Sequence, residues 1–215
     1  MNFALEASRS RHLEAGVKAV LGATTRLNLA LFEVATEREI VVDTNVGGRS
    51  TFKNAGCTRR SGLELGRESS LPFGLEAALA WTLLEATFHD TFTSGAVTVP
   101  SGNRLPAVAR NTLYGELRWK HAPSGFTLAL EAQHKSRVAA DDVNSDFAAG
   151  YTTANLAAGF TQSGGKWRLS EFIRIGNLAD RRYAGSVIVN ESNSRFFEPS
   201  PGRTAMVGVQ AKLGF

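Results

Sequence analysis

The sequence predicts an all-β fold of antiparallel strands that cross a membrane, and three observations favour it. Apolar and polar residues alternate in nine segments of the chain, and a strand of about ten residues crosses a bilayer when tilted. The connections between these segments alternate between short and long. No apolar run approaches the roughly 20 residues of a transmembrane helix. The mean hydropathy of -0.12 does not contradict this prediction, because alternating strands average to a neutral value.

The first four segments lie in the N-terminal half of the chain. Residues 12–19 read HLEAGVKA, 26–31 read RLNLAL, 62–65 read GLEL and 75–83 read LEAALAWTL. Apolar residues recur at every second position in each segment, which is the period of a strand with one apolar face.

The other five segments follow the same period. They are 113–120 (LYGELRWK), 126–133 (FTLALEAQ), 154–160 (ANLAAGF), 167–175 (WRLSEFIRI) and 203–215 (RTAMVGVQAKLGF). In the last segment, every second residue after the first is apolar, and the intervening face is polar or small apart from one methionine. The pattern therefore predicts one apolar and one wet face along the whole set of strands.

Glu171 conflicts with this pattern, because it falls on the apolar face between Leu169 and Ile173. A glutamate that faces lipid is unfavourable. Either a β-bulge that shifts the register or a position near the membrane surface would remove the conflict.

The connections favour a membrane barrel over a soluble sandwich. The short connections are 21–24, 68–73, 121–125 and 162–166, and the long ones are 36–57, 90–110, 139–150 and 178–202. Short turns at one end and long loops at the other are typical of bacterial outer-membrane barrels. Six aromatic residues lie near predicted strand ends or turns, as in interfacial girdles, although core aromatics would also fit: Trp81, Tyr114, Trp119, Tyr151, Trp167 and Phe215. We see no linker, so we expect one domain over residues 1–215.

The net charge, the single cysteine and the first residues each limit which partners and which cellular context we expect. The net charge is +4, but the basic residues are scattered, so we expect no nucleic-acid binding and instead a lumen or loop surface that attracts anions. Cys57 is the one cysteine, so it cannot form an internal disulfide. The opening MNFALEASRS lacks the pattern of a signal peptide, so we expect that Met1 is not the natural start of an exported chain.

The motifs of common enzymes are absent from the sequence, so we expect a protein that is not an enzyme and has no catalytic residues and no cofactor. The four histidines have no metal-ligand spacing, and we expect them to be lumen or rim residues rather than ligands: His12, His89, His121 and His134.

Two pairs of charged residues in long loops are candidate binding residues. Asp141 and Asp142 would bind a cation, or else lie in a solvated loop tip. Arg181 and Arg182, beside Tyr183, would meet an anionic chelate at the external mouth. Alternatively, these two arginines pair with lipid-A phosphates or with nearby acidic residues.

Several stretches resemble the C-terminal barrel half of TonB-dependent outer-membrane receptors. They include SRHLEAGVKAVL (10–21), NLALFEVATEREIVV (28–42), NAGCTRRSGLELG (54–66), SGNRLPAVARNTLYGELRW (101–119) and 175–215, which is the most specific. The last one resembles the asparagine-leucine-x-aspartate turn, the phenylalanine-glutamate-proline loop, the proline-glycine-arginine entry and the final strand of that family. Two features depart from the family pattern, namely Cys57 and the single proline of LPAVAR (105–110).

The resemblance implies the last nine strands of a 22-stranded barrel, without the N-terminal plug and the earlier strands. We therefore expect a fragment or a truncated product, which forms a curved open sheet and does not work as a transporter by itself. The final strand, with Ala211, Leu213 and the terminal Phe215, resembles the signal that the barrel-assembly machinery recognises.

The resemblance also implies a function and a location. In the bacterial outer membrane, a complete receptor imports a scarce nutrient such as a ferric siderophore or ferric citrate, driven by the TonB complex, and its outer surface contacts lipopolysaccharide and other outer-membrane lipid. Other readings stay open: another cargo such as haem, cobalamin, a copper complex or a quinone cofactor, a passive porin-like or enzymatic barrel, or a soluble β-sandwich binding module.

Overall fold

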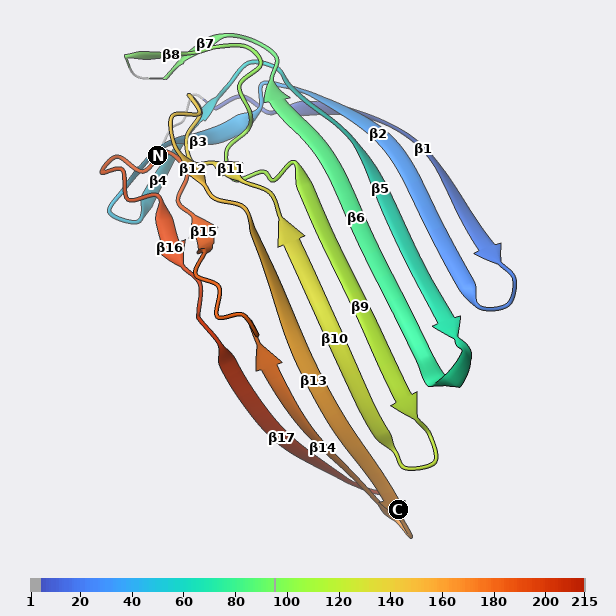
Figure 1. Cartoon of the computed structure of the whole chain (residues 1–215). Helices are drawn as coiled ribbons and strands as arrows, with labels where there is room; N and C mark the ends of the chain where they lie inside the picture. The colour runs from blue at the N-terminus through green and yellow to red at the C-terminus, as the bar shows by residue number, and fades with distance from the viewer. Residues whose placement is uncertain (1–4, 95, 215) are drawn as a thin grey trace.

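A nine-stranded antiparallel sheet dominates the fold. The structure, a computed structural model, describes residues 5–94 and 96–214. Within them the strand order is β1-β2-β5-β6-β9-β10-β13-β14-β17, so each strand pairs with the next long strand along the chain (Figure 1). The strands are β1 (Arg9–Leu21), β2 (Thr25–Glu37), β5 (Thr58–Leu71), β6 (Leu75–Phe88), β9 (Asn111–His121), β10 (Phe126–Lys135), β13 (Tyr151–Gly164), β14 (Trp167–Gly176) and β17 (Thr204–Leu213). The nine predicted segments are thereby confirmed.

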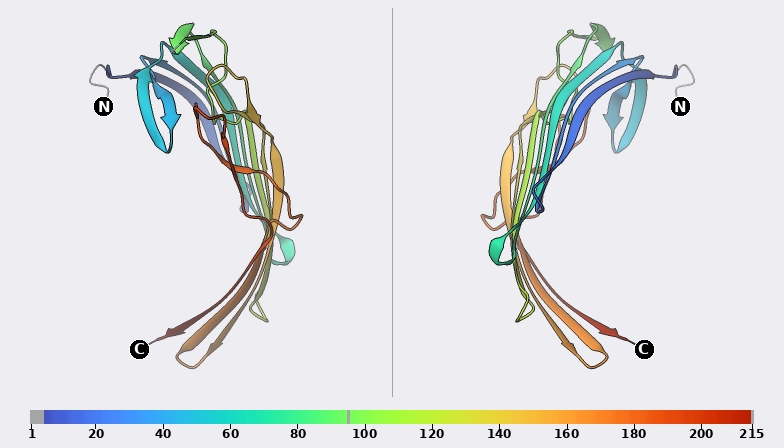
Figure 2. Two further views of the ribbon diagram at one scale, coloured as in Figure 1. Left: turned by 90° about the vertical axis from the view of Figure 1, so that its left-hand side faces the viewer. Right: turned by 90° about the vertical axis from the view of Figure 1, so that its right-hand side faces the viewer.

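The sheet is curved and open. In the described residues, β1 and β17 lie at its two edges and do not pair with each other, as predicted (Figure 2). Among the same residues, no helix combines the length and the hydropathy needed to cross a bilayer.

The connections are sorted by length, as the sequence predicted. The short turns, including the 3-10 turn η1 (Pro72–Gly74), lie at one end of the strands, and the four long loops gather at the other (Figure 1). Each long loop contains a small hairpin that the sequence analysis did not predict. These hairpins are β3 (Ile40–Val46) with β4 (Arg49–Asn54), β7 (Phe92–Ser94) with β8 (Val97–Val99), β11 (Val138–Ala139) with β12 (Phe147–Ala148), and β15 (Ala184–Val187) with β16 (Phe197–Pro199).

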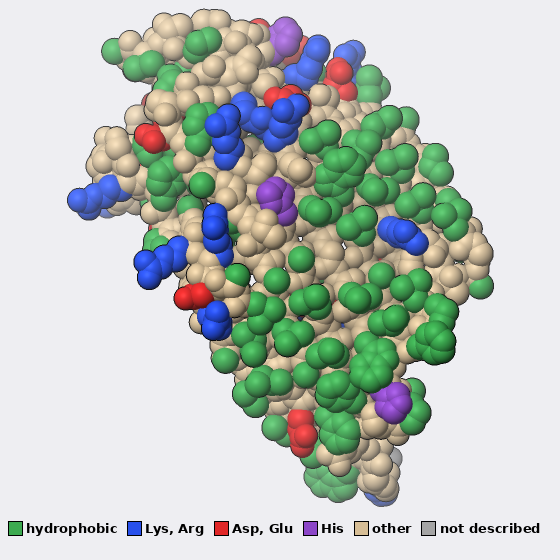
Figure 3. Space-filling model, viewed as in Figure 1, with side chains coloured by type: hydrophobic (Ala, Val, Ile, Leu, Met, Phe, Trp, Pro, Cys, Tyr) green, Lys and Arg blue, Asp and Glu red, His purple; other side chains and the backbone are tan. Residues whose placement is uncertain are grey.

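The two faces of the sheet differ as the alternation requires. The register of the nine strands has no shift, so cross-strand partners share one face and each face is continuous from strand to strand. The convex face carries most of the apolar side chains (Figure 3), and several are open to solvent: Val207 is 73% exposed, Val209 69% and Leu13 59%. The described residues form no second layer over this face, so it needs an apolar solvent or partner.

Glu171 lies on the convex face, as predicted. It pairs with Phe160 on β13 and with Val209 on β17 in an unbroken register. The β-bulge that would have turned Glu171 away is therefore absent from this part of the sheet, and that alternative is wrong. Glu171 comes four residues after Trp167, the first residue of β14, which places it toward the short-turn end.

The loops pack against the concave face at their end of the sheet. Ala86 and Phe88 of β6 project there and are buried against Ala55, Val99 and Leu105 from the loops. Phe92 of β7 meets the ring of Phe88 at a centroid distance of 4.9 Å. The upper concave wall and the loops therefore share one small hydrophobic core.

The aromatic positions are only partly those of a girdle. Trp119 and Trp167 lie at short-turn ends of strands and Tyr151 begins β13, as predicted. Trp81 instead lies in the middle of β6, where its indole donates to Asn111 Oδ1 at 2.8 Å. Tyr114, the fourth residue of β9, faces the concave side, where its hydroxyl donates to the Glu116 carboxylate, so the prediction is wrong for these two residues.

The residues of the expected assembly signal are partly described. Ala211 and Leu213 project from β17 on the convex face and pair with Leu169 and Trp167 of β14. Phe215 lies outside the described residues.

We expect Glu171→Leu to stabilise the folded chain in lipid vesicles by about 1 kcal/mol, because it removes a carboxylate from the apolar face. Urea unfolding followed by tryptophan fluorescence measures the change. Glu64→Leu, on the concave face, is the matched control and should give no such gain. Equal effects of the two substitutions would show that Glu171 does not face lipid.

Candidate functional site

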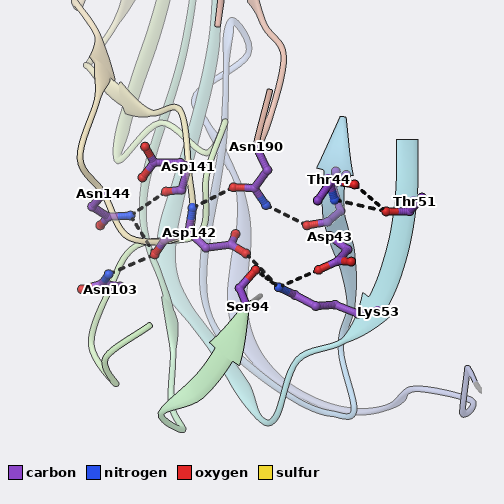
Figure 4. Close-up of polar contacts among 11 residues, drawn as sticks. Asp43, Thr44, Thr51, Lys53, Ser94, Asn103, Asp141, Asp142, Asn144 and Asn190 are labelled. Atoms are coloured by element: carbon purple, nitrogen blue, oxygen red, sulfur yellow. Dashed lines mark hydrogen bonds and ion pairs between the residues drawn. The ribbon is translucent and has the colours of Figure 1, made fainter. Parts of the chain in front are cut away.

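The candidate site is the loop cluster that covers the concave face at one end of the sheet. Polar side chains from all four long loops converge there on Asp142, between β11 and β12 (Figure 4). The nine strands deliver these loops to the same end, so residues far apart in sequence become neighbours.

Asp142 is a buried carboxylate with incomplete pairing. The residue is 3% exposed, and neither carboxylate oxygen has a hydrogen-bond partner among the described residues. Its nearest cation is Lys53 of β4, with Nζ 3.8 Å from Oδ2. Lys53 also lies 3.2 Å from the Asp43 carboxylate of β3 and hydrogen-bonds to the Ser94 hydroxyl of β7. One ammonium group thus serves two carboxylates.

Asn190 ties three of the loops together. Its side-chain amide donates to the Val42 carbonyl at 2.7 Å and its side-chain oxygen accepts from the Asp142 backbone amide at 3.1 Å. Its own backbone amide donates to the Ala140 carbonyl, and its carbonyl accepts from the Asn45 amide, both at 3.1 Å. The backbone of Asn190 has a positive φ of 54°, a conformation that asparagine tolerates better than most residues. The four bonds hold the hairpin loops in one arrangement.

Two further asparagines connect the remaining long loop, residues 90–110, to the loop that contains Asp142. Asn103 Nδ2 donates to the Asp142 carbonyl at 2.9 Å. Asn144 accepts from the Arg104 amide at 2.8 Å and donates to the Arg104 carbonyl at 2.9 Å. Asp141 points elsewhere, since its carboxylate accepts hydrogen bonds from the backbone and hydroxyl of Ser145 and closes the local turn.

The electrostatics of the cluster disfavour an ionised Asp142. Burial is the largest cause and raises the pKa of Asp142; Asp141 and Asp43 raise it further. The nearby Asn190 side chain and the charge of Lys53 lower the pKa of Asp142 but do not cancel this change. Removing a charged carboxylate from water is costly unless it is fully paired, so the closed cluster holds a costly charge.

Glu39, at the base of the same loops, is better paired. Burial raises its pKa, but hydrogen bonds from Arg60 at 3.0 Å and Thr58 at 2.8 Å outweigh burial and leave the pKa below its ordinary value. The charged form of Glu39 is therefore the stable one in the folded chain.

The structure separates the two predicted pairs of charged residues. Asp141 and Asp142 are both buried, so the expectation of a solvated loop tip is wrong. Arg181 and Arg182 are exposed, outside the Asp142 cluster, and neither forms an ion pair with an acidic residue among those described. Arg182 borders a shallow pocket of about 380 Å³, whose aromatic lining residues are Phe147, Tyr183 and Phe197.

Sequence reasoning missed Lys53, Asn103, Asn144 and Asn190. Each is a single polar residue in a long loop, and the only signal in the sequence was a side chain able to form hydrogen bonds or an ion pair. No cluster of three or more His, Cys, Asp or Glu side chains in the described ranges has an arrangement that would hold a metal ion.

Below the loops, the concave face is a polar wall. Arg174 of β14 pairs with Glu131 of β10, with Nη1 2.7 Å from Oε1, and Asn155 of β13 donates to the same carboxylate at 3.2 Å. Further across the sheet, a groove of about 630 Å³ runs between Glu14 and Glu64. The polar concave face and the loops that cover one end of it suit the binding or passage of a hydrated polar solute.

The family model described as TonB dependent receptor-like, beta-barrel matches residues 1–178. Solved structures share the fold at low sequence identity. The ferric preacinetobactin receptor BauA from Acinetobacter baumannii matches 94% of this chain at 20% identity and a TM-score of 0.72, over 29% of its own chain.

Two more receptors have the same relation to the chain. The ferric yersiniabactin uptake receptor FyuA from Yersinia pestis matches 97% of this chain at 20% identity and a TM-score of 0.74, over 30% of its own length. The unliganded ferric citrate transporter FecA matches 94% at 15% identity and a TM-score of 0.75, over 31% of its own length. The chain thus spans less than a third of each of these proteins.

We expect Asp142→Asn to stabilise the closed loop cluster at neutral pH by roughly 1 kcal/mol, because it removes an incompletely paired buried charge. Lys53→Met should destabilise it by about 1–3 kcal/mol, because it leaves that charge without its cation. Hydrogen exchange at the backbone amides of Asn45, Asp142 and Asn190 measures both changes. The double variant should lie close to Asp142→Asn, and simple additivity of the two effects would contradict the coupling.

We also expect the loop cluster to loosen as the pH rises. The pKa of Asp142 is higher in the closed cluster than in an exposed loop, so the closed form binds more protons between the two values. This window opens near about pH 4, the ordinary range of an aspartate, and ends at the raised pKa. The charges of Lys53, Asp43 and Asp141 act on the same carboxylate. Loss of the pH dependence in Asp142→Asn would assign it to Asp142, and an unchanged profile would contradict the assignment.

Proposed function

Because the chain belongs to the TonB-dependent receptor β-barrel family, we propose that it supplies wall and mouth to an outer-membrane receptor that imports a ferric siderophore-like nutrient. In this role the convex face contacts lipid and the concave face lines the passage. The external loops, with the Asp142 cluster at their base, surround the entrance. A TonB complex supplies the energy for import.

The observation that carries the proposal is the opposite character of the two faces. A soluble β-sandwich would cover its apolar face with a second sheet, whereas the described residues leave the convex face bare. A membrane wall instead exposes apolar side chains to lipid and polar side chains to water.

The nature of the cargo is supported by the similar structures. They are named as a ferric preacinetobactin receptor, a ferric yersiniabactin uptake receptor and a ferric citrate transporter, and a further similar structure is named as a siderophore receptor. An anionic iron chelate also suits the exposed guanidinium group of Arg182 beside the aromatic pocket and that of the exposed Arg181 next to it in the sequence. Haem, cobalamin, a copper complex and a quinone cofactor are alternative cargoes, and competition with the ferric chelate distinguishes them.

Assembly of this wall would use the last strand. The alternation of β17 presents Ala211 and Leu213 on the apolar face, in the orientation that an assembly factor for outer-membrane barrels would meet. The partner proposed here is the barrel-assembly machinery, and Phe215 completes the proposed signal.

We expect an antibody against residues 191–203 to detect the protein in the outer-membrane fraction of its source cells, and only detergent should release it, because the apolar face prefers lipid to water. Under iron limitation, the same cells should take up a radiolabelled ferric siderophore in a manner that stops when the proton gradient is collapsed. An unrelated outer-membrane porin, probed in the same fractions, is the control. Recovery of the antigen in the soluble fraction would contradict the membrane location, and uptake that persists without the gradient would contradict energy coupling.

A further inference from the structure

Glu171 is a carboxylate on the apolar convex face that has no cation beside it among the described residues. It lies between Leu169 and Ile173 on β14 and is partly exposed. No hydrogen bond or ion pair joins its carboxylate to another described side chain. Over the described lengths of β10, β13, β14 and β17, the convex face holds no lysine or arginine. A counter-charge for this carboxylate therefore has to come from outside the sheet.

The surface around Glu171 is hollowed into a groove of about 400 Å³, a volume within the range of small-molecule sites. Phe126, Phe160 and Glu171 stand in one cross-strand row, so two aromatic rings lie on one side of the carboxylate. In the next row toward the loops, the small side chain of Ala158 leaves room beside these rings. The other apolar side chains that line the groove on this face are Ile173, Val207 and Val209.

The position of Glu171 along β14 places it inside the apolar band rather than at its margin. Glu171 comes four residues after Trp167, the first residue of the strand, which is roughly 13 Å along the chain. Trp167 is 56% exposed, and tryptophan at the end of a membrane strand marks the level of the lipid headgroups. The carboxylate therefore lies below the headgroups, at the depth of acyl chains.

We infer that the groove around Glu171 binds amphiphilic organic cations, meaning molecules with one ammonium group on an apolar body. The carboxylate pairs with the ammonium group, and the rings of Phe160 and Phe126 supply the aromatic surface that attracts such a group. The apolar body fills the groove beside Ala158. A neutral apolar molecule would leave the carboxylate unpaired, and a small hydrated cation would leave the groove unfilled. The inference rests on the proposed membrane location.

The test measures how fast dicyclohexylcarbodiimide, an apolar reagent for carboxyl groups, labels Glu171 in the full chain. The chain is held in uncharged dodecylmaltoside micelles, and mass spectrometry of the peptide that contains Glu171 gives the rate. The probe is phenylbutyltrimethylammonium, and its control is the hydrocarbon with a tert-butyl group in place of the trimethylammonium group. We expect the ammonium compound to slow labelling by about tenfold and the hydrocarbon to have little effect, because only the former pairs with the carboxylate.

Ala158→Leu separates the role of the groove from that of the carboxylate. It fills the space for the apolar body and leaves Glu171 in place, so labelling should continue while protection by the ammonium compound falls severalfold. Ala132→Leu is the matched control, because Ala132 lies on the same face of β10 outside the groove, and protection should remain that of the unmodified chain. Equal protection by the two compounds, or equal loss in the two variants, would overturn the inference.

Further arms of the experiment separate other occupants of the groove. Without the probe, labelling should be equally fast in vesicles of phosphatidylcholine and of phosphatidylglycerol. Slower labelling in phosphatidylcholine would assign the groove to choline headgroups, and labelling in micelles that slows with rising protein concentration would assign it to a second copy of the chain. Either result would overturn the inference.

Insertion into the same vesicles tests the proposed membrane location by itself. A chain that does not insert would overturn that location and the groove with it. A chain that inserts but whose Glu171 does not distinguish the ammonium compound from the hydrocarbon would overturn the groove alone.

Discussion

The unbroken pairing of nine strands is the constraint on which the rest of the structure depends. Side chains alternate across a strand, so a slip of one residue between β2 and β5 would send Leu31 and Leu63 to opposite faces. Continuous register keeps every strand in phase, and the apolar residues form one band rather than scattered patches. Because the described residues cover this band with nothing, the environment must supply its apolar contacts. The fold of this chain is therefore inseparable from its solvent.

The same pairing determines where the polar chemistry lies. Antiparallel neighbours with short turns at one end bring all the long loops to the other end. There the loops do not extend freely, since they pack on Phe88 and are joined through Asn190 and Asp142. The sheet forms a rigid wall, and the loops cover one end of its concave face as a roof. The incompletely paired Asp142 lies within these loops. A roof that contains a costly buried charge is easier to open than one made only of hydrophobic contacts.

The alternation was enough to predict the nine strands, the sorting of their connections and the place of Glu171, because all three follow from a period of two. The small hairpins of the loops were not predicted, and strands as short as β11 and β12 are too brief to show a period. The burial of Asp142 was also beyond the local pattern. Two consecutive aspartates in a loop indicate solvent, and contacts from distant loops, such as that with Asn190 48 residues later, enclose Asp142. Trp81 was assigned to a strand end because the predicted segment was shorter than the real β6.

The bond from Asn190 to the Val42 carbonyl joins positions 148 residues apart, and this separation bears on the order of folding. Contacts that close long stretches of chain form late, because the entropy of closure must first be offset by the structure between them. Here the intervening chain contains β5 to β14, so the wall has to be paired before Asn190 can reach the first hairpin. The loop cluster is thus the last part of the molecule to form, and its formation requires that the strands beneath it are already paired.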